Sequence, residues 1–331
     1  MSKGFAVIGY GGAFSEGRLH ANALNSTPGL HLVGVYDVDP ARVKQAKVDF
    51  PAAKGYQSLE ELIADSEVYG VVVVTPHSTH RDLVVKLLEG GKAVVCEKPM
   101  ATTAKEADDM LEASRRAGLP LTIFQNRRWD SDYLTVKAVV ESGVLGNVFL
   151  YESTVEGYGE PSGWRREKKY GGGMLYDWGA HLIDQALQLV KAELTSVYAR
   201  IDYGRVWNVD VDTHSLVVMN FEGTEYAVET GSTEAVQKPR WRVLGESGGL
   251  QAEWDKGKIS LRKAGAVQID GEIKMLKGDW MEFYRKLSRA LNEGGDMPVK
   301  PEESRDAIAV IEAAFESAKR DQPVKPKLLR G

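Results

Sequence analysis

Strand patterns and helix patterns alternate along the first 124 residues, and this alternation restricts the fold more than any other feature of the sequence. The strand patterns are short and almost wholly apolar, as expected of strands that are buried on both faces of a sheet. A chain that alternates in this way forms a parallel, doubly wound sheet covered by helices. The expected strands are residues 5–8, 32–36, 69–74, 93–96 and 119–124.

Two short motifs mark where helices begin between these strands. Ser58 precedes Glu61, and Thr103 precedes Glu106, at the spacing of a capping box. In this motif the hydroxyl accepts a hydrogen bond from the backbone three residues later, and the carboxylate there accepts one in return. The sequence therefore predicts helices that start directly after Ser58 and Thr103.

The first strand runs directly into a glycine-rich turn that contains Gly9, Gly11 and Gly12. Glycines permit a tight bend and a close approach of the backbone to a pyrophosphate, which then rests on the N-terminus of the next helix. Phe14 stands where the third glycine of this pattern is expected, so Gly17 fits only if the turn carries three extra residues. A glycine pattern alone is weak evidence for a dinucleotide site.

An acidic residue follows the second strand at the distance typical of dinucleotide folds. Asp37 lies 20 residues after Gly17, where such folds bind a ribose. A carboxylate there accepts hydrogen bonds from both ribose hydroxyls of NAD and repels the additional phosphate of NADP. The alternative is a strand-end aspartate that starts the turn into Asp39 and Pro40. We expect NAD as the cofactor, with NADP less favoured.

Polar residues follow the third and fourth strands of this region. Residues 75–80 come after one strand and residues 97–99 after the next, at the sheet edge where such folds bind ligands. The ammonium of Lys98 can donate a hydrogen bond to an oxygen whose negative charge grows during a reaction. A solvated surface lysine is the alternative interpretation.

Beyond residue 124 the strands become longer and alternate apolar with polar residues. Residues 216–221 and 226–230 flank a turn and predict a hairpin, and residues 250–254 and 259–261 predict another. Strands with one apolar face require a cover, which helices near residues 279–291 and 302–318 can provide on one side. An α+β fold with a large, mostly antiparallel open sheet is expected, and the other face of this sheet is expected to meet another subunit.

The stretch from Gly171 to Asp184 is where we expect the chemistry. Its three leading glycines let the backbone approach another group closely, and the residues after them have a helical pattern. Asp177, His181 and Asp184 are spaced so that they share one helix face. A carboxylate one turn from an imidazole can fix its tautomer, as a general base near neutral pH requires. The alternative is an ordinary helix whose Asp and His satisfy each other.

Composition and charge narrow the classes of partner. The net charge is −5 and the basic residues are scattered, so a nucleic acid and an anionic membrane are poor candidate partners, and a small molecule is favoured. The single Cys96 excludes an internal disulfide and a multi-cysteine zinc site, and it suits a reducing compartment. We find no signal peptide or membrane-spanning run and expect a cytoplasmic protein.

Taken in chain order, these motifs resemble the Gfo/Idh/MocA oxidoreductases, a family named for glucose-fructose oxidoreductase, inositol dehydrogenase and a rhizopine-catabolism protein. The resemblance covers essentially the whole chain. It rests on the longer dinucleotide turn with His20, on residues 75–80 and 97–99, on Asn126-Arg127 and on the run from Gly172 to His181. It implies an N-terminal NAD(P)-binding Rossmann domain at residues 1–124 and a C-terminal substrate-binding and oligomerisation domain at residues 125–331.

The resemblance also implies roles for individual residues, although the longer turn leaves the separate roles of residues 12–16 open. The implied catalytic residues are Lys98, Asp177 and His181. Around the cofactor it places Gly9, Gly11, Gly12, Ala13, Phe14, Asp37, Thr75, Pro76, His77, His80, Glu97, Lys98 and Asn126. The implied substrate-binding residues are Lys98, Arg127, Trp164, Arg165, Asp177 and His181, and no metal is implied.

These expectations describe an NAD-dependent dehydrogenase that oxidises a secondary hydroxyl of an inositol, a sugar or a sugar derivative. His181 would take the alcohol proton, Lys98 would steady the oxygen, and hydride would pass to the nicotinamide ring. Two alternatives remain: an NAD-dependent glycosidase of the same family, and a cofactor-sensing regulatory protein without turnover. A homodimer or homotetramer that forms through the C-terminal sheet is expected.

Overall fold

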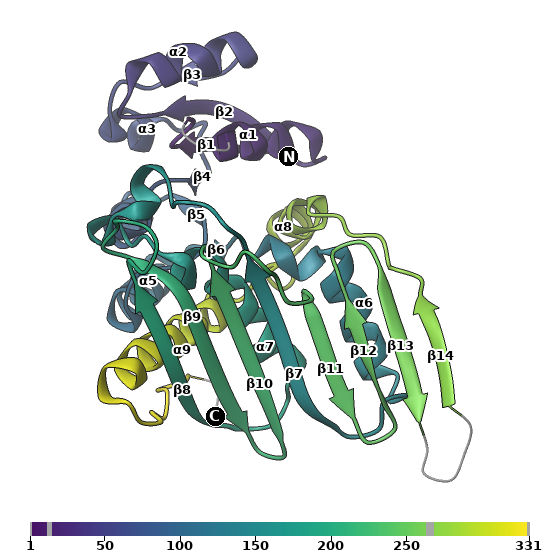
Figure 1. Cartoon of the computed structure of the whole chain (residues 1–331). Coiled ribbons are helices and arrows are strands. Elements are labelled where there is room, and N and C mark those ends of the chain that lie inside the picture. Colours follow the sequence, from purple (N-terminus) through teal and green to yellow (C-terminus); the bar gives the residue numbers. More distant parts are fainter. Residues whose placement is uncertain (1, 12–14, 263–267, 330–331) are drawn as a thin grey trace. The chain divides into compact units, whose positions relative to one another are not determined.

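The computed structural model describes residues 2–11, 15–262 and 268–329, and the chain divides into two compact units (Figure 1). The first unit contains Met1–Gln125 and Met281–Arg305. The second unit contains Asn126–Trp280 and Asp306–Gly331. Each unit is built around a sheet of its own, and the chain returns to the first unit after it has completed most of the second.

The first unit has a six-stranded parallel sheet in the order β3-β2-β1-β4-β5-β6. The order reverses between β1 and β4, which is the doubly wound topology of a Rossmann fold. The parallel sheet predicted from the alternating patterns is therefore confirmed, and the structure adds the two-residue strand β3. The strands are β1 (Lys3–Ile8), β2 (Leu30–Tyr36), β3 (Lys54–Gly55), β4 (Gly70–Val73), β5 (Ala93–Cys96) and β6 (Leu121–Ile123).

The helices of this unit begin where their capping residues predict. Ser58 accepts a hydrogen bond from the backbone N–H of Glu61 at 3.1 Å. Thr103 and Glu106 form a complete capping box, in which each side chain accepts from the other's backbone N–H at 3.1 Å. Both predicted helix starts are confirmed. The helices are α1 (Glu16–Ser26), α2 (Pro40–Asp49), α3 (Leu59–Ala64), α4 (His80–Glu89) and α5 (Ala104–Ala117).

Helix α8 (Met281–Glu293) belongs to the first unit, and its expected place as a cover for the second sheet is wrong. Tyr284 on α8 shares a hydrogen bond with Nδ1 of His20 on α1. Ser288 donates to a backbone carbonyl in the loop before β2 at 2.6 Å. The amphipathic pattern of α8 shows that one face is buried, but a pattern cannot specify which sheet buries it.

The second unit has an eight-stranded sheet in the order β14-β13-β12-β11-β7-β10-β9-β8. Its neighbours are antiparallel except for the parallel pair β7 and β10, so the predicted mostly antiparallel sheet is confirmed. The two predicted hairpins are β9–β10 and β12–β13. The strands are β7 (Val148–Glu156), β8 (Leu194–Tyr203), β9 (Asp212–Phe221), β10 (Thr224–Gly231), β11 (Trp241–Gly245), β12 (Gly248–Ala252), β13 (Gly257–Arg262) and β14 (Gln268–Ile273).

One face of this sheet packs against helices. Helices α6 (Ser131–Glu141), α7 (Ala180–Leu189) and α9 (Pro301–Arg320) lie on the same side of the strands (Figure 1). Ser317 of α9 accepts a hydrogen bond from a backbone N–H of β8 at 3.0 Å, which ties the helix to the sheet. Along β9, Val217 is buried whereas Leu216 and Val218 are half-exposed. The sheet therefore keeps a second face whose side chains are only partly covered.

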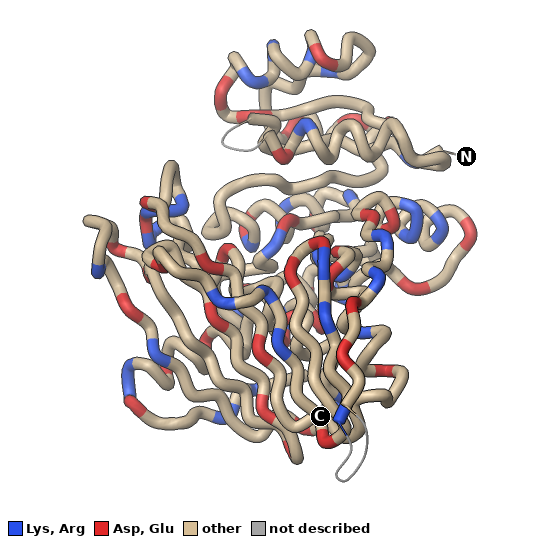
Figure 2. The backbone as a smooth tube through the Cα atoms, turned by 45° about the vertical axis from the view of Figure 1, so that its right-hand side comes forward, with Lys and Arg blue, Asp and Glu red and all other residues tan. Residues whose placement is uncertain are grey.

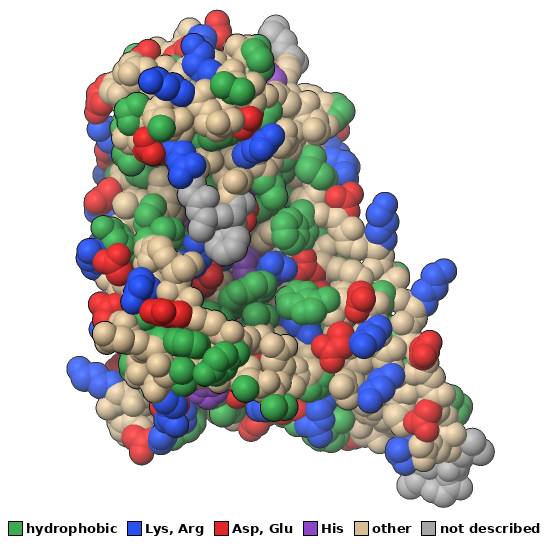
Figure 3. All heavy atoms as spheres, turned by 45° about the horizontal axis from the view of Figure 1, so that its top comes forward, with side chains coloured by type: hydrophobic (Ala, Val, Ile, Leu, Met, Phe, Trp, Pro, Cys, Tyr) green, Lys and Arg blue, Asp and Glu red, His purple; other side chains and the backbone are tan. Residues whose placement is uncertain are grey.

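Acidic and basic residues are interspersed along the described chain (Figure 2). The surface view in Figure 3 likewise shows acidic, basic and apolar side chains mixed on the face it presents. Within the described residues, no helix has the length and apolar character needed to span a bilayer.

Candidate active site

Glycines shape the turn between β1 and α1. Gly9 has a φ of 87°, and a Cβ there would lie 1.9 Å from the carbonyl oxygen of Val74, so only glycine fits. Helix α1 begins at Glu16, and a Cβ on Gly17 would lie 2.2 Å from the carbonyl oxygen of Gly9. Gly17 thus lets the helix pack directly on the turn, as the third glycine of the usual motif does. Three of the predicted cofactor residues, Gly12, Ala13 and Phe14, lie outside the described residues.

Asp37 joins the end of β2 to this turn. Its Oδ2 accepts hydrogen bonds from the backbone N–H groups of Tyr10 at 2.8 Å and Gly11 at 3.3 Å. Its Oδ1 accepts from the N–H of Asp39 at 2.9 Å. A carboxylate offers about four acceptor positions, so Asp37 retains capacity for a ribose hydroxyl.

Arg42, which the sequence analysis did not single out, lies against the same turn. A Cβ on Gly11 would lie 2.2 Å from Cδ of Arg42, so the arginine stem covers this glycine. Its Nε is 3.7 Å from the carboxylate of Asp39, and about half of the side chain is exposed. A guanidinium in this position can attract a phosphate, which offsets part of the repulsion expected from Asp37.

The loop after β4 is tied to the loop after β5 by a histidine. His80 is fully buried, with Nε2 2.9 Å from the carbonyl oxygen of Thr75 and Nδ1 2.9 Å from that of Pro99. Burial lowers the pKa of His80, although both carbonyl partners favour a proton on the ring. Pro76 and the buried His77 lie in the same loop. His80 therefore holds together the two segments that carry the predicted cofactor residues.

A chain of hydrogen bonds fixes the backbone at Lys98. Tyr284 contacts Nδ1 of the buried His20, and His20 Nε2 is 2.8 Å from Oε1 of Glu97. Oε2 of Glu97 accepts from the backbone N–H of Lys98 at 3.0 Å. Burial alone would raise the pKa of Glu97, but the hydrogen bond and charge of His20 together with Lys98 lower it. In the sequence, His20 is recognisable only as a motif residue, and no pattern marks Tyr284.

One group in the described chain brings three potential metal-ligating atoms within 4.8 Å of one another. It consists of Glu16, His20 and Glu97. The hydrogen bond between His20 and Glu97 already satisfies two of these side chains. This bond accounts for the proximity of His20 and Glu97.

In the second unit, Arg127 is surrounded by tryptophans. Its guanidinium carbon lies 4.2 Å from the ring centroid of Trp178, 5.3 Å from that of Trp280 and 5.5 Å from that of Trp254. Its Nη1 donates to Asp130 at 2.9 Å. Cation–π contacts and this ion pair hold the arginine rigidly beside the segment that carries His181. Asn126 precedes it in a short 3₁₀ turn and is also buried.

The glycines at 171–173 accommodate other parts of the same unit. A Cβ on Gly172 would lie 2.3 Å from the carbonyl oxygen of Arg165. Gly173 has a φ of 106°, and its Cβ would lie 1.9 Å from Oδ1 of Asp212. The close approach predicted from the sequence therefore includes the protein's own backbone and the carboxylate of Asp212, a residue that the sequence analysis missed.

The segment after these glycines is helical, as predicted, but its first turn is a π-helix over Leu175–Gly179, followed by α7. Asp177 accepts a hydrogen bond from Nε of Arg165 at 3.1 Å, and the Arg165 guanidinium lies 4.6 Å from the ring of Trp164. His181 is 4% exposed, and its ring centroid is 6.0 Å from that of Trp178. A π-turn in a helix is common at functional sites.

Asp184 forms a separate ion pair. Its two carboxylate oxygens accept from Nε and Nη2 of Arg128 at 2.7 and 2.6 Å. Asp184 is buried and Arg128 is largely buried, and this bidentate pair links α7 to the turn at residues 126–129. Of the three residues that the spacing places on one helix face, Asp184 is therefore held in an ion pair with Arg128.

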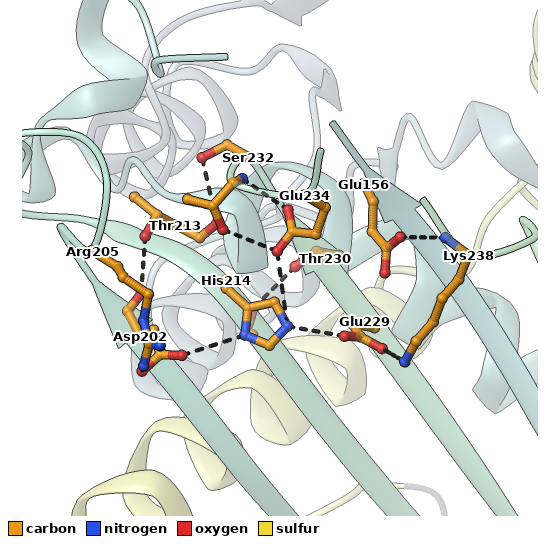
Figure 4. A network of polar contacts seen from close by, with 12 residues as sticks. Glu156, Asp202, Arg205, Thr213, His214, Glu229, Thr230, Ser232, Glu234 and Lys238 are labelled. Atoms are coloured by element: carbon orange, nitrogen blue, oxygen red, sulfur yellow. Dashed lines mark hydrogen bonds and ion pairs between the residues drawn. The ribbon is translucent and has the colours of Figure 1, made fainter. Parts of the chain in front are cut away.

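A second group of titratable side chains lies on the partly covered face of the sheet (Figure 4). His214 Nε2 is 3.0 Å from Oε1 of Glu229, and its Nδ1 is 3.6 Å from Oδ2 of Asp202. The hydrogen bond with Glu229 raises the pKa of His214, and the same bond lowers the pKa of Glu229. Lys238 pairs with Glu229 from the other side, so opposite charges compensate within the group.

Comparisons with known proteins match both units. Residues 3–125 match the family described as "Oxidoreductase family, NAD-binding Rossmann fold", and residues 133–251 match the "GFO/IDH/MocA C-terminal domain". A solved structure named as an NAD-binding protein from Listeria innocua is 31% identical with a TM-score of 0.90, covering 100% of this chain and 98% of that one.

Two relatives with named activities align over most of the chain. The scyllo-inositol 2-dehydrogenase (NADP(+)) IolW of Bacillus subtilis (strain 168) is 28% identical over 313 residues, 86% of each protein. The myo-inositol 2-dehydrogenase of Thermotoga maritima is 26% identical over 336 residues, 96% of this chain and 97% of the relative.

The Gly173→Ala variant tests the close approach of Asp212. Both the positive φ and the contact with Asp212 oppose a Cβ, so we expect a loss of about 2 kcal/mol or more in stability and a thermal midpoint lower by at least ~4 °C. Calorimetry measures this shift. The control is Gly157→Ala, because a Cβ on Gly157 would meet no atom within 4 Å. Equal midpoints for the two variants would contradict the geometry.

Proposed function

The chain belongs to the Gfo/Idh/MocA family of oxidoreductases, and we propose that it is an NAD-dependent dehydrogenase that oxidises a secondary hydroxyl group of an inositol, a sugar or a sugar derivative. Relatives that are named inositol 2-dehydrogenases align over most of its length, which supports a cyclic polyol as the substrate class. The catalytic residues of the proposal are Lys98, Asp177 and His181.

The observation that carries the proposal is the setting of His181. Its ring is almost fully buried beside Trp178, whose indole also packs against the guanidinium of Arg127. A general base requires an imidazole that is held in one orientation and is shielded from bulk water. Aromatic walls with a few fixed polar groups are also typical of small-molecule sites.

In the proposed reaction, three side chains accept the proton, stabilise the reacting oxygen and position the reacting groups. Bound NAD supplies the acceptor for the hydride. His181 takes the proton of the reacting hydroxyl, and the ammonium of Lys98 donates a hydrogen bond to the oxygen as its negative charge grows. Asp177, beside Arg165, holds His181 or a neighbouring substrate hydroxyl in place. No metal ion takes part.

Cofactor binding is assigned to the turn after β1 and to the loops after β4 and β5. Gly9 and Gly11 would let the backbone approach the pyrophosphate, and Asp37 would accept hydrogen bonds from the ribose. The remaining cofactor residues of the proposal are Thr75, Pro76, His77, His80, Glu97, Lys98 and Asn126. Arg127, Trp164 and Arg165 join the three catalytic residues in binding the substrate.

A substrate panel tests the reaction class. Purified protein with NAD is mixed with inositols, pyranoses and uronic acids while the absorbance of reduced nicotinamide is followed. A dehydrogenase accumulates reduced cofactor with at least one of these compounds. A glycosidase cleaves glycosides without net reduction, and a regulatory protein binds NAD without any turnover, so either result would overturn the proposal.

Replacing Asp37 tests the cofactor preference. Asp37→Ser removes a charged acceptor from the proposed ribose site, so we expect NAD affinity to fall about tenfold or more while NADP affinity changes less. Fluorescence titration with each reduced cofactor measures both affinities. Asp39→Ser is the matched control, because it removes the same charge but keeps a helix-capping oxygen. If the wild type binds NADP as tightly as NAD, Arg42 outweighs Asp37 and the preference is wrong.

Replacing His181 and Lys98 tests their roles in the reaction. General-base catalysis contributes roughly 10²- to 10⁴-fold, so His181→Ala should lower kcat by that order while NAD affinity stays within a few-fold. Lys98→Ala should be similarly severe at saturating substrate, because the group that steadies the developing alkoxide is lost. The exposed His31 and Lys44 provide matched alanine controls. Turnover within a few-fold of wild type for His181→Ala would give the base role to another group.

We propose that the partly covered sheet face mediates assembly into a homodimer or homotetramer. Leu216 and Val218 are half-exposed on this face, and burial against a second subunit would remove their apolar surface from water. Light scattering should therefore give a mass of at least twice 36.4 kDa. Replacing both residues with Lys should yield monomers, whereas Val48→Lys, at an apolar residue that is 72% exposed in the first unit, should not. A monomeric wild type at micromolar concentration would contradict this.

A further inference from the structure

We propose that Asp212 is a positioning residue of the active site, whose buried carboxylate fixes the start of the helical segment that carries Asp177 and His181. The inference rests on the proposed function, because it gives these two side chains their catalytic roles. Asp212 opens β9, some thirty residues further along the chain than His181. Its side chain acts through the backbone of that segment.

The contact is direct and buried. Oδ2 of Asp212 accepts a hydrogen bond from the backbone N–H of Leu175 at 2.7 Å, and the N–H of Met174 also bonds to the carboxylate. Asp212 is 2% exposed. The first N–H groups of a helix have no partner within the helix, so a carboxylate here can accept their hydrogen bonds. Its negative charge is also stabilised by the positive end of the helix dipole.

The backbone around this carboxylate has no room for adjustment. Gly173 has a φ of 106°, and a Cβ on it would lie 1.9 Å from Oδ1 of Asp212. The carbonyl oxygen of Gly173 accepts from the N–H of Asp177 at 3.1 Å. Asp212 therefore packs against Gly173 and accepts hydrogen bonds from the next two residues, Met174 and Leu175. A backbone hydrogen bond joins Gly173 of the same turn to Asp177.

The carboxylate also sets the local charge. Burial raises the pKa of Asp212 to about 6, against the lowering effect of its backbone hydrogen bonds, and the charge of Asp177 raises it further. Among the described residues, Tyr203 lies opposite Asp212 on β8, and Arg165 donates to Asp177. Above pH ~6 the ionised Asp212 places a negative charge at the positive end of the dipole of the helical segment that carries His181.

The raised pKa of Asp212 makes the folded protein less stable at high pH than at low pH. The folded-state pKa lies above the unfolded value of 3.8, so stability from this group is present below pH ~4 and is lost as the pH rises through about 6. Asp212→Asn replaces one acceptor oxygen with an amide group that donates, which disturbs the bonds to the turn. It also removes the ionisation and the cost of the buried charge, and it keeps the side-chain volume. At pH 8 we therefore expect this variant to unfold at a temperature no lower than that of the wild type.

The decisive measurement compares Asp212→Asn with the wild type on a substrate found in the panel. Misplacement of catalytic groups by about 1 Å can cost on the order of 100-fold, so we expect kcat to fall about 10- to 100-fold, with KM and NAD affinity within about threefold. The acid limb of the pH profile of kcat/KM should lose one ionisation near pH 6. The matched control is Asp210→Asn, which removes an exposed carboxylate that accepts from the N–H of Lys168.

Two results would overturn the inference. One is kcat within twofold of wild type with an unchanged pH profile. The other is a loss of kcat that follows a loss of folded protein and recovers on cooling, because a purely structural contact would behave in this way.

Hydrogen exchange separates this inference from the proposed function, because it requires no turnover. Asp212→Ala should speed exchange of the amides of residues 174–189 at least tenfold, with little change in the first unit. If the wild type turns over no compound in the panel, the proposed function fails, and exchange still decides whether Asp212 holds the segment. Unchanged exchange in Asp212→Ala would overturn the inference whatever the panel shows.

Discussion

Both segments that carry the proposed catalytic residues are held by a largely buried carboxylate that accepts a backbone N–H. Glu97 accepts from the N–H of Lys98 at 3.0 Å, and Asp212 accepts from the N–H of Leu175 at 2.7 Å. A buried carboxylate is costly unless its oxygens are bonded, and a bonded one restricts its partner strongly. The same arrangement thus arises independently in the two units, on a parallel sheet and on a mostly antiparallel one.

The two carboxylates differ in how their charge is stabilised. Glu97 has His20 as an ionisable partner, and its pKa is lowered despite burial. Burial raises the pKa of Asp212 and the carboxylate of Asp177 raises it further, and the hydrogen bonds from backbone N–H groups offset only part of this. The protein therefore holds a charge in the second unit that costs stability at neutral pH. Such a cost is expected where a site is arranged for reaction and not for maximum stability.

Periodicity in the sequence predicted the local structure well, because it depends on which residues are apolar and on short-range hydrogen bonds. The capping box at Thr103 and Glu106 and the hairpin of β9 and β10 formed as predicted. Helix α8 was assigned to the wrong unit, since an amphipathic helix has the same pattern on either sheet. Asp184 has the spacing of a site residue, but its bidentate pair with Arg128 depends on a contact 56 residues away along the chain.

The sequence by itself determined the doubly wound sheet, the largely antiparallel sheet, the family and the stretch from Gly171 to Asp184 that we propose for catalysis. Only the tertiary structure decided what approaches Gly173 and what holds Lys98. Asp212 is an ordinary strand-start residue in the sequence, and Tyr284 is one aromatic residue on an amphipathic helix. Their partners lie 37 and 264 residues away along the chain, at Leu175 and His20, and no local pattern specifies contacts at such separations. Folding brings them together because buried polar groups must find partners, and these partners are the ones within reach.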